Sequence, residues 1–126
     1  KVDSSLTNIF IGSWVGTHYC SFDGPFNIAA GNTSTSFTPT MSNGPIQKVT
    51  ANGSFALEAP SGMSAGQSIT LIITQDATGS RVMTPNAAYK FAYGLKLLST
   101  AGGSIDMLSI FYDGTNYLCN LVRGYV

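Results

Sequence analysis

Side chains able to carry out acid–base or nucleophilic chemistry are scarce in this chain of 126 residues. His18 is its single histidine, and Cys20 and Cys119 are its only thiols. A Ser-His-Asp triad would have to use His18, which lies in an aromatic, strand-like segment. The glycines are dispersed and none precedes a helical pattern, so no phosphate-binding loop is predicted.

Paired carboxylates could act as general acid and base, but the chain has few acids. Asp76 and Asp113 lie in turn sequences, where aspartate commonly accepts hydrogen bonds from its own backbone. Asp106 lies within a predicted strand, and a structural pairing with Arg81 or Lys90 is expected there rather than catalysis. The remaining acids are Asp3, Asp23 and Glu58. We therefore predict that the chain is not an enzyme.

Metal and disulfide chemistry are limited in the same way. A zinc site would need His18, Cys20, Asp23 and Cys119 to converge from nearly opposite ends of the chain. We expect neither a metal nor a cofactor. Both cysteines lie in apolar stretches, which favours two buried free thiols. One disulfide closing a large loop is the alternative.

The charge content excludes several partners. Six basic and six acidic residues give a net charge of zero, and charged residues make up only 10% of the chain. Such a chain lacks the basic surface that binds nucleic acid. No run approaches the roughly 20 apolar residues of a membrane span. Its surface must be covered by small polar residues or by other protein chains.

Short apolar runs separated by Gly, Pro, Asn and Asp indicate an all-β domain. Residues 6–15 are typical of one or two strands, and residues 21–45 are looser. From residue 46 the pattern sharpens, with strands predicted at 46–50 and 54–58 around a three-residue turn. Residues 68–74 alternate cleanly between apolar and polar.

The C-terminal pattern predicts a hairpin, with strands at 105–112 and 116–122 around a short loop that contains Gly114. Both faces of the strand at 105–112 are apolar. Such a strand lies in the centre of a sandwich or is covered by another subunit. With a further strand at 81–84, the count is about eight or nine strands. We predict one domain over residues 1–126, a β-sandwich or jelly-roll-like fold with a looser N-terminal arm over residues 1–45.

Three residues are candidates for contact with a partner or another subunit: Arg81, Tyr93 and Trp14. Arginine and aromatic residues are enriched at protein interfaces. Arg81 closes the turn that begins at Asp76, so an ion pair or a backbone contact that stabilises this turn is the simpler interpretation. Exposed aromatic rings could also stack on sugars, although most aromatic residues of a small β-domain belong to its core.

The second half of the chain contains a set of blocks that follow one another in a characteristic order. The blocks are Gln67–Arg81, Tyr89–Phe91, Leu98–Ala101, Ile105–Ser109, Tyr112–Asn116 and Val122–Tyr125. In these blocks and their order, the chain resembles a module common in bacteriophage tail-fibre and virion-surface proteins. It departs from that family at residues 83–85 and 92–96, which concerns loop surfaces rather than the fold.

This resemblance implies a compact β-sandwich, generally homotrimeric, that serves as a non-enzymatic part of the virion exterior. A short chain without shaft repeats favours a capsid decoration or cement protein that binds the major capsid protein. The alternative is a tail-fibre or receptor-binding tip domain that contacts fibre or tail proteins and host surface glycans or proteins. Neither interpretation involves nucleic acid, a membrane or a cofactor.

Overall fold

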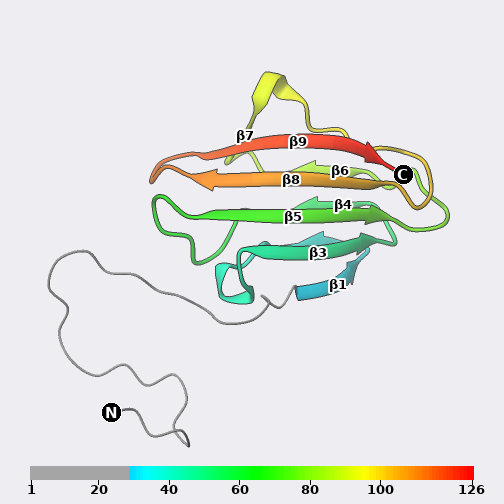
Figure 1. Cartoon of the computed structure of the whole chain (residues 1–126), viewed down its shortest axis with the longest axis horizontal. Coiled ribbons are helices and arrows are strands. Elements are labelled where there is room, and N and C mark those ends of the chain that lie inside the picture. Colours follow the sequence, from blue (N-terminus) through cyan, green and yellow to red (C-terminus); the bar gives the residue numbers. More distant parts are fainter. Residues whose placement is uncertain (1–28) are drawn as a thin grey trace, which may run out of the picture.

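The computed structural model describes residues 29–126, which form two β-sheets and two short 3-10 turns (Figure 1). The all-β prediction is confirmed for these residues, and none of their helices is long and apolar enough to cross a membrane. The predicted strands at 6–15 lie outside the described residues. The elements are β1 (Ala29–Thr33), β2 (Ser36–Phe37), η1 (Met41–Asn43), β3 (Ile46–Ala51), β4 (Phe55–Leu57), β5 (Ser68–Gln75), β6 (Met83–Pro85), β7 (Tyr89–Phe91), η2 (Ala92–Gly94), β8 (Ile105–Tyr112) and β9 (Tyr117–Tyr125).

The first six strands alternate between the two sheets. β1, β3 and β5 lie side by side and parallel in a six-stranded sheet, and β2, β4 and β6 do the same in a three-stranded sheet. Each pair of consecutive strands therefore makes one coil, and the coils stack in a solenoid-like arrangement. Our sequence analysis predicted a β-sandwich or jelly roll, and this stacking differs from both.

The turn after β3 shows why the sequence pattern led to a different topology. A three-residue turn is compatible with a hairpin, but here it carries the chain into the opposite sheet. The amide of Asn52 donates to the carbonyl oxygen of Thr33 (3.0 Å), one coil below. A Cβ on Gly53 would lie 2.9 Å from the Cβ and carbonyl oxygen of Ser34, so the two corners can stack only with glycine at position 53.

An antiparallel hairpin completes the six-stranded sheet. β8 pairs antiparallel with β5 and with β9, and β7 joins the far edge parallel to β9. The hairpin predicted at 105–122 is confirmed. Its loop is closed by the Asp113 carboxylate, whose Oδ1 accepts from the amides of Thr115 (2.8 Å) and Asn116 (2.6 Å). These bonds lower the pKa of Asp113.

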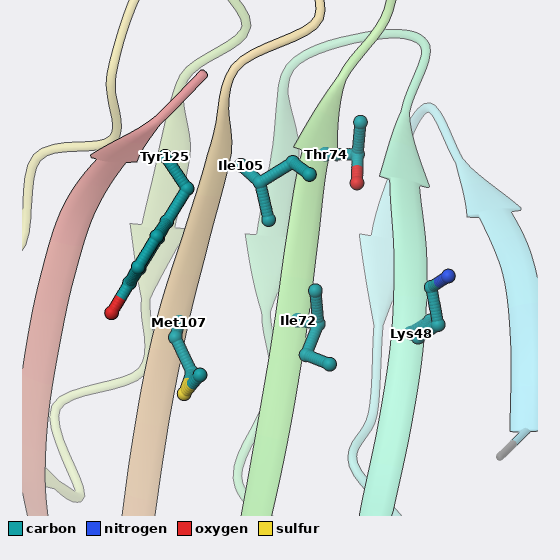
Figure 2. A pocket seen from close by; sticks show the side chains of 6 residues that line it. All are labelled: Lys48, Ile72, Thr74, Ile105, Met107 and Tyr125. Carbon is teal, nitrogen blue, oxygen red and sulfur yellow. The ribbon is translucent and has the colours of Figure 1, made fainter.

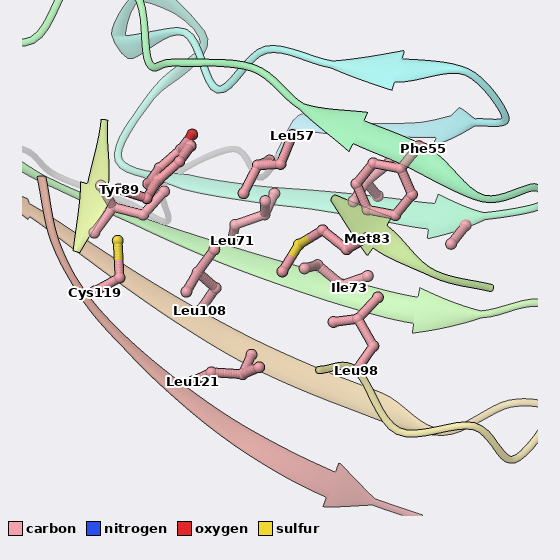
Figure 3. Packing of buried hydrophobic residues seen from close by; sticks show 13 residues of the cluster. Phe55, Leu57, Leu71, Ile73, Met83, Tyr89, Leu98, Leu108, Cys119 and Leu121 are labelled. Carbon is pink, nitrogen blue, oxygen red and sulfur yellow. The ribbon is translucent and has the colours of Figure 1, made fainter. Parts of the chain in front are cut away.

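The core lies between the two sheets (Figure 3). Alternate residues of each long strand point into it, as the period of two in the sequence predicts. Leu71 and Leu108 are fully buried and neighbours in register, so they occupy the middle of the core. The cluster contains Val49, Ala51, Phe55, Leu57, Leu71, Ile73, Met83, Tyr89, Leu98, Leu108, Ile110, Cys119 and Leu121.

Replacing Leu108 by alanine should lower the free energy of unfolding by about 2–5 kcal/mol, because a fully buried side chain is removed and a cavity remains. Ser42, which is exposed in η1, is the control, and Ser42→Ala should change stability by less than about 0.5 kcal/mol. Urea denaturation followed by circular dichroism measures both. Equal effects of the two substitutions would contradict this assignment of the core.

Candidate functional site

The turn after β5 and the long loop before β8 form one hydrogen-bonded unit. Gln75, the last residue of β5, is buried. Its Nε2 donates to the carbonyl oxygens of Arg81 and Ser99 (both 2.9 Å), and its Oε1 accepts from the amide of Arg81 (2.9 Å). One amide side chain therefore closes the turn and fixes the loop to it.

An ion pair braces the same turn. The guanidinium Nη2 of Arg81 lies 2.6 Å from Oδ2 of Asp76, and its Nε donates to Oδ1 at 3.1 Å. Oδ1 also accepts from the amide of Gly79 (3.0 Å). The side-chain bond from Arg81 lowers the pKa of Asp76 and, by the same contact, raises that of Arg81. The ion pair that we favoured for Arg81 is present, and its contact with a partner stays a prediction.

The turn and the loop approach each other so closely that glycine is required. Gly79 has a φ of 73°, and a Cβ there would collide with the carbonyl oxygen of Thr100. The amide of Ser80 donates to that same oxygen (2.8 Å), and Ser80 itself has a φ of 57°. The backbone of the loop thus packs directly against the backbone of the turn.

Asp106 fixes the other side of the loop. Its carboxylate is buried and accepts from the amide and hydroxyl of Ser99 (both 2.7 Å) and from the amide of Gly124 (2.9 Å). The predicted pairing with Arg81 or Lys90 is wrong. Backbone and hydroxyl donors satisfy this carboxylate, while Arg81 binds Asp76. The structural role expected for Asp106 is nevertheless the one that these contacts support.

Between β7 and this fixed loop, a short segment stands out from the molecule. It includes η2 and is visible in Figure 1 as the yellow turn beside β7 and β9. Tyr93 at its tip is 99% exposed, and Leu95 and Leu97 are also exposed. Tyr93 has a φ of 54°, a left-handed conformation that an L-residue with a bulky side chain rarely adopts. The segment therefore presents an aromatic ring to solvent on a strained backbone.

The described residues contain no cluster of three metal-ligating side chains. Burial raises the pKa of the Cys119 thiol to about 12, so it is unsuited to nucleophilic chemistry at neutral pH. Cys119 is buried, as expected for it, and forms no disulfide within residues 29–126. Trp14, His18 and Cys20 lie outside the described residues, so the predictions about them stay untested.

One motif escaped the sequence analysis. Residues 62–66, Gly-Met-Ser-Ala-Gly, have the spacing of a nucleophile elbow. The structure places Ser64 in a turn before β5, where the Gln67 amide donates to its carbonyl oxygen (3.0 Å) and its own amide donates to Gln67 Oε1 (2.7 Å). A nucleophile elbow needs a helix after the serine, and a strand follows here. The spacing alone therefore carries no catalytic inference.

Residues 37–117 match the family described as "Putative phage tail fibre C-terminal domain". The match spans more than half of the chain. The chain therefore belongs to this family of phage tail-fibre C-terminal domains. Its place is accordingly on the virion exterior, as the sequence resemblance implied. Neither a curated protein nor a solved structure matches the chain. The family favours the tail-fibre alternative over capsid decoration, which nothing in the structure or the comparisons supports.

Removing the Asp76 carboxylate should destabilise the protein in a pH-dependent way. The pKa of Asp76 is lowered from its ordinary 3.8 in the folded state. Its stabilising effect is therefore fully present above that value and is lost as the pH falls through the lowered folded pKa. We expect Asp76→Asn to melt below the wild type at pH 7, with the difference shrinking as the pH falls below 3.8.

Glu58→Gln, which removes an exposed carboxylate from outside the turn, is the control for net charge and should leave the melting temperature unchanged at pH 7. Thermal unfolding of the three proteins at pH 7 and at a series of pH values below 3.8 is the measurement. A deficit of Asp76→Asn that persists unchanged in acid would show that the ion pair is not its cause.

Proposed function

We propose that this domain is the host-contacting end of a homotrimeric tail fibre and that the segment of residues 92–97 makes the contact. The observation that carries the proposal is the almost complete exposure of Tyr93 on a backbone that tyrosine rarely adopts. The proposed ligand is a glycan or protein of the host surface. The domain acts by binding alone, and no cofactor takes part.

The backbone of Tyr93 argues for a role in binding. A left-handed conformation costs an L-residue about 1–2 kcal/mol relative to the right-handed one. Glycine would remove that cost, and it follows immediately at position 94 with a φ of 68°. Strained residues persist at binding and switch sites, where the geometry of the side chain matters more than stability.

The chemistry of the segment fits a sugar or a protein surface. A tyrosine ring offers a flat apolar face and a hydroxyl, and such amphipathic rings are frequent anchors of interfaces. Leu95 and Leu97 extend the apolar surface, and Lys96 is the single charged residue between Ala92 and Leu97. The segment starts from β7 and ends at the loop held by Gln75 and Asp106, so the ring is displayed from fixed supports.

The place of the domain in the particle can be tested by counting copies. Quantitative mass spectrometry of purified particles should find a few copies per hundred subunits of the major capsid protein, as a fibre component requires. A ratio near one to one would instead establish a decoration or cement protein. Absence from the particles would contradict both.

Replacing Tyr93 should separate binding from stability. Tyr93→Gly relieves the backbone strain but adds flexibility to the unfolded chain, so stability should be unchanged or higher by up to about 1 kcal/mol. Binding to cells of a strain that the phage infects should fall about tenfold or more, because an anchoring aromatic side chain is lost. Flow cytometry with the labelled full chain measures binding, and thermal unfolding measures stability.

Two variants serve as controls. Tyr93→Phe keeps the ring and should bind within a few-fold of the wild type. Asn43→Ala changes an exposed residue in η1 and should leave binding unchanged. Undiminished binding by Tyr93→Gly, or no binding of the wild type to any such strain, would overturn the receptor-contacting role.

A further inference from the structure

The outer face of the six-stranded sheet, which looks away from the core, is mostly apolar along β8 and β9, where a row of Ser109 and Asn120 interrupts the apolar residues. The strand register places Ile72, Met107 and Val122 side by side in one row across β5, β8 and β9. The next row contains Thr74, Ile105 and Tyr125. We call these residues, with Phe111 and Leu118 of a further row, the outer apolar face.

Figure 2 shows this face from outside, with six side chains projecting from four neighbouring strands. They line a shallow hollow of about 360 Å³. Phe111, Leu118, Val122 and Tyr125 are each between 42% and 47% exposed, too much for a core and unusual for so many neighbours on a solvated face. No described segment of the chain covers them.

A solvated sheet normally shows polar residues on its outer face. β3 follows this rule with Lys48 and Thr50, and β5 follows it with Thr70 and Thr74. β8 and β9 follow it only at Ser109 and Asn120. In the other rows Met107, Phe111 and Val122 stand where polar residues are expected. The strand at 105–112 was predicted to be covered on both faces, by a sandwich or by another subunit. In the structure the core covers one face of this strand, and the outer face is open to another subunit.

We propose that copies of this chain pack against one another through the outer apolar face. The inference rests on the self-association proposed above and not on the receptor contact by Tyr93. It names which surface of the domain lies between the subunits.

The distribution of charge favours a second copy over a charged partner. The described carboxylates are elsewhere: Asp106 is inside, Asp76 and Asp113 are in turns, and Glu58 follows β4 of the other sheet. The cations Lys48 and Lys90 lie on β3 and β7, toward opposite sides of the sheet. A largely apolar, uncharged centre with charge only at its rim is the usual composition of a subunit interface.

The size of the face limits how strongly two copies can bind. Three strands about 4.8 Å apart and about eight residues long, with a rise of about 3.3 Å per residue, give a face of about 380 Å². Around a three-fold axis each face is shared between two neighbours, so the three faces bury about 1,100 Å² in all and each pair of subunits buries about 380 Å². That is less than a stable two-chain interface needs, so the subunits associate only when all three contacts form together.

The test is the mass of the full chain in solution, measured by light scattering over a range of concentrations. The wild type should have three times the 13.2 kDa mass of one chain. Met107→Asp places a charge at the centre of the face and should give single chains with an unchanged circular dichroism spectrum. Thr84→Asp, at an exposed position of β6 in the other sheet, is the matched control and should remain trimeric.

A milder variant tests the same face in case Met107→Asp does not fold. Val122→Thr keeps the shape and the strand preference of the side chain but adds a hydroxyl, so it should fold and dissociate at higher concentrations than the wild type. A trimer that survives both Met107→Asp and Val122→Thr would show that another surface joins the subunits. A monomeric wild type would overturn self-association itself, and destabilisation of that monomer by Met107→Asp would point to residues 1–28 as the cover.

Discussion

The pairing of β5 on both of its sides is the constraint on which the rest of the domain depends. One edge of β5 is bonded to β3 in parallel, which continues the stack of coils, and the other edge is bonded to β8 in antiparallel, which ends it. The same strand divides its side chains strictly between the core and the outside. A shift of one residue in this register would turn Leu71 and Ile73 outward and destroy the core.

The end of β5 also determines where the loops lie. Gln75 is the last residue of the strand and uses its side-chain amide to hold Arg81 and Ser99. From the far side, the buried carboxylate of Asp106 holds Ser99 as well. The long loop before β8 is therefore anchored at a single residue by two buried polar groups, and these groups are fully satisfied by their partners. Because the loop is held in this way, the segment around Tyr93 protrudes from a fixed support.

Within residues 29–126, the Tyr93 segment and the outer apolar face differ in form and thus in the partners that suit them. The Tyr93 segment is narrow, strained and protruding, which suits insertion against a foreign surface. The outer apolar face is broad, flat and in register, which suits another sheet of the same kind. Both are consistent with a domain that assembles with its own copies and binds at its loops, as proposed for this member of the tail-fibre family.

The amino-acid sequence by itself determined the all-β class, the strands at 68–74 and 105–122, and the turn chemistry of Asp76 and Asp113, because alternation and turn residues are local signals. It also showed that the strand at 105–112 is apolar on both faces. Only the tertiary structure decided that the turn after β3 leads into a second sheet. A hairpin and a coil of stacked strands can use the same short turn. They differ in the strands that pair, and here the partners of β3 lie about 20 residues away in the sequence. It also decided that donors from Ser99 and Gly124 satisfy Asp106, and that Tyr93 stands exposed, because exposure and long-range hydrogen bonds depend on which segments meet in space.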